Sequence, residues 1–194
     1  RHLKDAGQTT KAIPMADCPN YNCAGWEDYV QGTCGETYLG GGASVVLIKC
    51  GTTIADPSDG TEINNAVTAG NAVVIDDVLI TFAAPSAITN DSFVANQPEI
   101  VADYDREVSL VDRNVTAQNV EFYNSINSST GAQIGGMIIY EKEADRVTYV
   151  DAAMTGTGGR VFANGEIQRF EFTFAYRAEG DAPIYDAPTG VFNQ

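Results

Sequence analysis

The four cysteines are the residues whose type and spacing could do chemistry. They are Cys18, Cys23, Cys34 and Cys50, with Cys-x4-Cys-x10-Cys-x15-Cys spacing. Zinc ribbons usually present two close pairs, and here only the first pair approaches that spacing. The chain has no Cys-x-x-Cys redox motif. An even number of cysteines favours one or two disulfides. Buried thiols and a four-cysteine zinc site are the alternatives.

Other catalytic groups are scarce. The only histidine is His2, so Cys–His and Ser–His–Asp catalysis lack a base on the predicted core. Carboxylates are paired at Asp76 and Asp77, and again at Asp103 and Asp105. Adjacent strand residues point to opposite faces, and the second pair lies on the polar face of an amphipathic strand. We predict no enzyme, with no catalytic, metal-binding or cofactor-binding residue.

The charge is strongly acidic. The 194 residues include 26 Asp and Glu against 11 Lys and Arg, a formal net charge of -15. Such a chain repels nucleic acid, because binding a duplex requires cations that replace counterions. No apolar run reaches 18 residues, so we predict no membrane span. These features leave structural and interaction proteins as the favoured classes.

Alternating apolar residues predict strands along most of the chain. In residues 168–177 ("QRFEFTFAYR") aromatic side chains take every second position, which is typical of a half-buried antiparallel strand. Residues 99–111 alternate too, whereas 43–50 and 72–85 are more uniformly apolar. Turns at 143–145 and at Asn164-Gly165 predict two hairpins. Helix signals are confined to 60–69, with a capping box at Asp59 and Glu62, and 117–126, with Thr116 as the cap.

These patterns predict a mainly β fold, an antiparallel β-sandwich or barrel with one or two short helices and extended terminal arms. We expect a flexible N-terminal arm over 1–16, a single β-rich domain over 17–177 and an extended C-terminal arm over 178–194. The domain would begin with a segment stapled by cysteines, 17–50. The C-terminal arm carries four apolar residues, Ile184, Tyr185, Val191 and Phe192. They must bury in a groove of the same chain or of a neighbouring subunit, where they would be inter-subunit contacts.

The order of elements over 99–177 resembles the tail-tube and related virion proteins of tailed bacteriophages. The stretches that carry the resemblance are "DYDREVSLVDRNVTAQNVEFYNSI", "GGMIIYEKEADRVTYVDAAM" and "EIQRFEFTFAYRAEGDAP". The resemblance implies a small β-sandwich whose copies form stacked rings, which can be hexameric. The rings would enclose an acidic lumen through which DNA slides. It also implies a homo-oligomer that contacts other virion proteins and is assembled in the host cytoplasm. No site residue carries over, because this family works through surfaces.

Two other readings share the fold class. A capsid decoration or head-fibre protein would be monomeric or trimeric, and disulfides would suit its external position. A secreted β-sandwich binding module or extracellular filament subunit would be extracellular. The binding module would need an exposed aromatic strip, for which the candidates are Tyr21, Trp26, Tyr29 and Tyr38.

Overall fold

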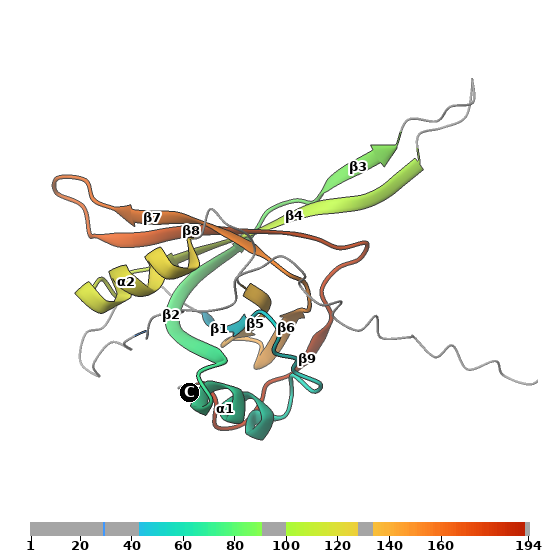
Figure 1. Ribbon diagram of the computed structural model, residues 1–194, viewed down its shortest axis with the longest axis horizontal. Helices are drawn as coiled ribbons and strands as arrows, with labels where there is room; N and C mark the ends of the chain where they lie inside the picture. Colours follow the sequence, from blue (N-terminus) through green and yellow to red (C-terminus); the bar gives the residue numbers. More distant parts are fainter. Residues whose placement is uncertain (1–28, 30–42, 91–99, 128–133, 193–194) are drawn as a thin grey trace, which may run out of the picture.

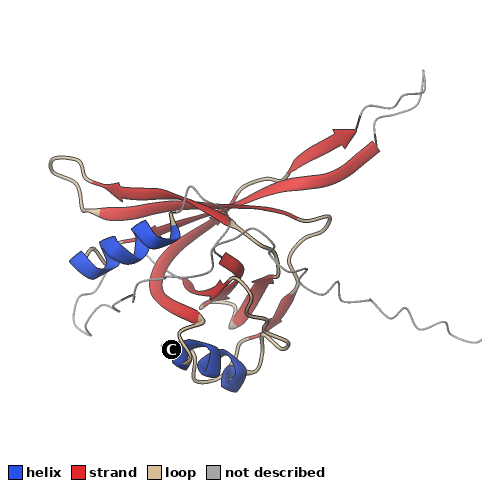
Figure 2. Cartoon of the chain, viewed as in Figure 1, coloured by secondary structure: helices blue, strands red, loops and turns tan. Residues whose placement is uncertain are grey.

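The computed structural model describes Tyr29 and residues 43–90, 100–127 and 134–192. The elements in these ranges pair as antiparallel strands and confirm the mainly β fold with few helices (Figure 2). The strands are β1 (Ala43–Lys49), β2 (Ala72–Phe82), β3 (Ser86–Asn90), β4 (Ile100–Asp112), β5 (Ile134–Glu141), β6 (Arg146–Val150), β7 (Thr155–Val161), β8 (Arg169–Arg177) and β9 (Ile184–Asp186). The helices are α1 (Gly60–Thr68) and α2 (Ala117–Ile126).

The strands form two sheets that share β2 (Figure 1). Sheet A has the order β9-β6-β5-β1-β2, and sheet B the order β2-β4-β8-β7 with β3 beside β4. Residues 72–78 of β2 pair with β1, and residues 79–82 pair with β4. One strand therefore forms the corner at which the chain passes from one sheet to the other.

A β-bulge in β2 lies next to this corner. Ala43 pairs with Val78 while Val45 pairs with Ile75, so two residues of β2, Asp76 and Asp77, stand opposite one residue of β1. Asp77 has a positive φ of 58°, a conformation that Asp tolerates better than most side chains. An extra residue on one strand bends it and increases its twist. The bulge thus accounts for the curvature of β2.

The main core fills the space between the two sheets. Sheet B contributes the alternating aromatic residues of β8, all of them buried, and sheet A contributes aliphatic side chains such as Leu47 and Met137. Phe122, Tyr123 and Ile126 of α2 pack against the same core. Burying one large apolar side chain contributes about 1.5–3 kcal/mol. The predicted half-buried strand at 168–177 is therefore present as β8, and its aromatic face holds the sandwich together.

A second core covers the opposite face of sheet A. Ile63 and Ala66 of α1 pack there with Ile54, Tyr140 and Phe192. Because both faces of β1 are covered, five consecutive residues from Ser44 to Ile48 are buried. This explains why 43–50 is uniformly apolar in the sequence, whereas β8 alternates.

Both predicted helices form, with the predicted caps. Asp59 accepts a hydrogen bond from the Thr61 amide at the start of α1, and Thr116 accepts one from the Asn119 amide at the start of α2. The reciprocal half of the predicted capping box differs. Glu62 accepts hydrogen bonds from the amides of Ala55 and Asp56 instead of returning to Asp59. Glu62 therefore orders the loop that leads into α1.

Glycine in β7, the edge strand of sheet B, allows β7 to lie close to its neighbour β8. A Cβ atom on Gly158 would overlap the Glu171 carbonyl oxygen and approach Phe172 Cα to 2.7 Å, whereas one on Gly159 would meet nothing within 4 Å. We expect Gly158→Ala to lower the free energy of unfolding by about 2 kcal/mol, because the strand pair must move apart. Gly159→Ala is the matched control and should change it by less than about 0.5 kcal/mol. Urea unfolding measures both, and equal losses would contradict this account of β7.

Candidate functional site

A two-stranded ribbon projects from the body of the molecule (Figure 1). It consists of β3 and residues 100–104 of β4. β4 is 13 residues long, about 43 Å when extended, and it pairs with β8 only from Asp105 onward. On the ribbon Ser86, Ala87 and Thr89 are exposed, and Val101 is 46% exposed. A two-stranded ribbon on its own is at best marginally stable in water, so these exposed faces are a candidate docking surface.

The base of the ribbon is held by polar contacts with the segment after β8. Arg106 donates to Asp181 over 2.6 Å and to the Ala178 carbonyl over 3.3 Å. Arg177 at the end of β8 pairs with Asp105 over 2.9 Å. These contacts close the end of the β4–β8 pairing at the point where the ribbon begins.

Large apolar side chains are exposed at several separate places. In β2 they are Leu79 (49%) and Phe82 (45%), in the β7–β8 loop Phe162 (66%) and Ile167 (67%), and in β9 Ile184 (56%) and Tyr185 (36%). Scattered apolar residues are normal on a surface. Here they lie on a hairpin loop, on β2 and on an edge strand, and hairpin loops and edge strands are positions from which proteins can contact other chains.

The structure divides the predicted C-terminal arm into two parts. Ile184 and Tyr185 lie exposed in β9, which pairs with β6 at the edge of sheet A. Phe192 is buried and stacks on Tyr140 with ring centres 4.6 Å apart, and Val191 packs beside it. The groove that receives Val191 and Phe192 thus belongs to the same chain, while an inter-subunit role for Ile184 and Tyr185 stays a prediction.

Of the four predicted structural cysteines, the structure describes Cys50, which is buried directly after β1. Cys18, Cys23 and Cys34 lie outside the described residues, as do the arm 1–16 and most of the segment 17–50. Their pairing therefore stays a prediction. Tyr29 is described and is half-buried, so it does not belong to an exposed aromatic strip. Its three proposed companions lie outside the described ranges.

Tyr29 takes part in a buried polar cluster around Asp112, at the end of β4. The hydroxyls of Tyr29 and Tyr123 each donate a hydrogen bond to Asp112 Oδ2 over 2.8 Å. The backbone amide of Asn114 donates one to Asp112 Oδ1 over 2.7 Å. The ring of Tyr29 lies edge-on to Phe122, with centres 5.3 Å apart. The cluster attaches Tyr29 to α2 and β4.

Burial is the main influence on the acid–base behaviour of this cluster. Asp112 is 1% exposed, and this desolvation raises the pKa of its carboxyl although three hydrogen bonds oppose the shift. Burial, and then the nearby Asp112 charge, raises the pKa of Tyr29 and of Tyr123, so both phenols remain donors. Raised carboxyl pKa values also occur at catalytic sites. Here both carboxylate oxygens already accept hydrogen bonds from the protein and are closed to solvent, which is the arrangement of a structural anchor.

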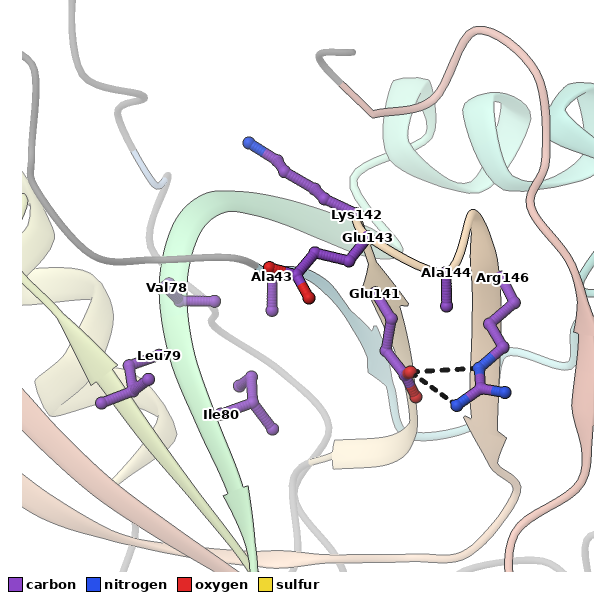
Figure 3. A pocket seen from close by; sticks show the side chains of 9 residues that line it. All are labelled: Ala43, Val78, Leu79, Ile80, Glu141, Lys142, Glu143, Ala144 and Arg146. Atoms are coloured by element: carbon purple, nitrogen blue, oxygen red, sulfur yellow. Dashed lines mark hydrogen bonds and ion pairs between the residues drawn. The ribbon is translucent and has the colours of Figure 1, made fainter.

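A hollow of about 580 Å³ lies between β2 and the turn that joins β5 to β6 (Figure 3). Val78 and Ile80 point into it from β2, and Ala43 lies between the two walls. On the other wall Glu141 and Arg146 form an ion pair over 2.9 Å, and Glu143 points inward. Lys142 points away from the hollow and pairs with Asp77. The hollow has mixed charges and an open shape, and these favour no particular small ligand.

Two comparisons of the sequence with known proteins were negative. A scan against protein-family models finds no match, and a search of curated proteins also finds none. Within the described ranges, no three His, Cys, Asp or Glu side chains gather where they could hold a metal ion. Neither α1 nor α2 is long and apolar enough to cross a membrane.

Sequence reasoning predicted the hairpin at Asn164-Gly165, which is present between β7 and β8, but it missed the exposed apolar side chains of that loop, the ribbon and the Asp112 cluster. The sequence did contain one signal for the Asp112 cluster. Asp112 follows Val108 and Leu110 at a spacing of two, so it had to share their buried face in a strand that continued that far. The ribbon had no comparable signal, because alternation along β4 does not reveal where its pairing with β8 begins.

The raised pKa of Asp112 predicts a pH-dependent contribution to stability. A native pKa above the unfolded value gives stabilisation that is fully present below the unfolded pKa and is lost as pH rises through the native pKa. Asp112→Asn removes this titration. We therefore expect the free energy of unfolding of the wild type, minus that of Asp112→Asn, to increase as pH falls from 7 to about 4. Urea unfolding at several pH values measures the difference.

Tyr123→Phe supplies the opposing case for the same cluster. It keeps the ring and removes one donor to the Asp112 carboxylate, so the charged form loses more than the neutral form. The variant should lose more stability at pH 7 than near pH 4. A pH-independent difference in both variants would contradict the proposed balance between burial and hydrogen bonding.

The C-terminal contact makes a separate prediction. Phe192→Ala should lower the free energy of unfolding by about 3 kcal/mol, because it empties a buried site against Tyr140. Ile184→Ala, at an exposed site on the same segment, is the control and should cost less than about 0.5 kcal/mol. Thermal and urea unfolding measure both. A small loss for Phe192→Ala would mean that the segment does not stay on its own chain in solution.

Proposed function

We propose that this chain is a self-assembling structural subunit of a phage virion, of the tail-tube type, whose copies form stacked rings around an acidic lumen. The observation that carries the proposal is the projecting ribbon. A ribbon with exposed faces gains stability when a second copy covers it. The same proposal places the protein in the virion, after assembly in the host cytoplasm.

Open sheet edges support assembly from several copies. β7 is the last strand of sheet B, has seven residues, and carries a single charge, Arg160. β9 ends sheet A and exposes Ile184 and Tyr185. In proteins that stay monomeric, edge strands are usually short or are protected by charges, prolines or bulges. β7 is thus a weakly protected edge, whereas β9 is protected by its length of three residues, by Pro183 before it and by Asp186 within it. An open β7 edge suits a subunit that meets a neighbour on that side.

The outward face of sheet B suits a lumen that DNA must not bind. Asp105, Glu107 and Glu171 point away from the core, as judged from their alternation with buried residues. The cations of this face, Arg169 and Arg177, each form an ion pair with a neighbouring acid. A face whose cations are already paired offers little to phosphate.

A capsid decoration or head-fibre protein is the second candidate. It is favoured by the burial of Val191 and Phe192 in their own chain, because a self-contained subunit needs no arm exchange. Such a protein would be a monomer or trimer in solution. A secreted binding module is less well supported, since Tyr29 is engaged in the Asp112 cluster.

The experiment that tests the proposal combines negative-stain electron microscopy with light scattering on the purified chain. The wild type should form rings or hollow filaments, and six-fold rings would favour the tube over other assemblies. The informative variant replaces residues 88–103 by Asn-Gly, which joins the register partners Ala87 and Tyr104 through a two-residue turn. It should keep its melting temperature within a few degrees and lose assembly.

A matched control lengthens another hairpin instead. Two glycines inserted beside Ala144 in the β5–β6 turn leave the ribbon intact and should leave assembly unchanged. A monodisperse wild-type monomer or trimer would reject the tube proposal in favour of the second candidate. Assembly that persists without the ribbon would remove the observation on which the proposal rests.

A further inference from the structure

The loop between β7 and β8 contains the Asn164-Gly165 pair that predicted the hairpin. Every residue of this loop, 162–168, is exposed. The Glu166 amide donates a hydrogen bond to the Ala163 carbonyl over 3.0 Å, so residues 163–166 form a β-turn. Figure 1 shows the loop at the outer end of β7 and β8. Asn164 is therefore open to water at the end of a hairpin.

Gly165 suits the turn and leaves its own backbone nitrogen accessible. Its φ of 86° lies in the left-handed region, which is the conformation that a type II turn needs at its third residue. A Cβ atom built on Gly165 would meet nothing within 4 Å. Because Gly165 has no side chain and open space surrounds it, the Asn164 side chain can approach the Gly165 nitrogen without a clash.

We propose that Asn164 is a site of spontaneous covalent modification, at which its side-chain amide is lost through a cyclic imide formed with Gly165. Solvent hydroxide removes the proton of the Gly165 nitrogen, which attacks Asn164 Cγ and forms a new C–N bond. The Cγ–Nδ2 bond then breaks, and the leaving nitrogen takes a proton from water and departs as ammonia, which regenerates the hydroxide. Water adds to one of the two imide carbonyls and opens the ring, so residue 164 becomes aspartate or isoaspartate.

The modification changes both the charge and the main chain of the loop. Either product adds one carboxylate to a chain whose formal net charge is -15. The new carboxylate lies close in sequence to Glu166, whose partner Arg169 already pairs with Glu171 as well. In isoaspartate the main chain runs through the former side chain and is longer by one methylene group, which disturbs the hydrogen bond that closes the turn. The inference goes beyond the proposed assembly and does not depend on it.

Two other exposed asparagines lack one of these conditions. Asn124 lies inside α2, where helical hydrogen bonds fix the backbone on both sides of it. Asn127 donates its side-chain amide to the Gly158 carbonyl over 2.8 Å, which holds the nitrogen that would have to leave. We therefore expect the modification to be selective for Asn164.

Peptide mapping by mass spectrometry tests the inference on the full chain, incubated in neutral buffer. Trypsin cleavage after Arg160 and Arg169 releases residues 161–169, in which Asn164 is the one asparagine. Conversion raises the mass of this peptide by about 1 Da, and reversed-phase chromatography separates the aspartate product from the isoaspartate product. Asn164 should convert at least about tenfold faster than Asn124, a difference of about 1.4 kcal/mol in activation free energy.

Two matched variants and one peptide keep the result interpretable. Asn164→Ser, at an exposed turn position, should abolish the mass change of this peptide, whereas Asn124→Ser should leave it unaltered. A synthetic peptide of residues 160–169 gives the rate of conversion without the fold. If Asn164 of the folded chain stays unchanged while the peptide converts, the turn protects the site and the inference is overturned. Equal conversion at Asn124 and Asn164 would also overturn it, because the loop would then confer no selectivity.

Discussion

The bulge in β2 is the constraint on which the rest of the molecule depends. Asp76 and Asp77 together oppose a single residue of β1, and the bend that results lets β2 pair with β1 first and with β4 afterwards. Without that bend the strand would continue in one sheet, and β4 and β8 would have no position from which to face β1 and β5. Lys142 pairs with Asp77 and links the bulge to the β5–β6 turn. A local change of backbone direction thus creates the two-layer core.

Two consequences follow from this corner. Sheet A receives cover on both faces, from the aromatic residues of sheet B on one side and from α1 and Phe192 on the other. Sheet B is covered on one face, so its strands alternate, and its outer surface carries charged side chains such as Asp105, Glu107 and Glu171. β4 extends beyond its pairing with β8. The first residues of β4 therefore lie outside the sandwich, where they form the ribbon with β3. Core and projecting surface are therefore parts of one long strand.

The surfaces left exposed are consistent in character. The ribbon, the loop between β7 and β8 and the edge strands lie at the periphery of the sandwich. Each exposes apolar side chains or the unpaired backbone groups of a sheet edge to solvent. The buried Asp112 cluster is different, because every oxygen of its carboxylate is engaged by the protein. The cluster therefore stabilises the fold, and the exposed surfaces are the basis of the proposal that copies of this chain assemble.

The sequence by itself determined the elements. Alternation of aromatic residues defined β8, a uniformly apolar run indicated β1, and Asp59 and Thr116 set the starts of both helices, since these signals are local and depend on periodicity and capping. The tertiary structure alone decided which surfaces remain open. The length of β4 beyond β8, the return of Phe192 to Tyr140 and the burial of Asp112 beneath Tyr29 join residues far apart in the chain. Local patterns carry no information on such pairings, because they depend on where the bent β2 directs the neighbouring strands.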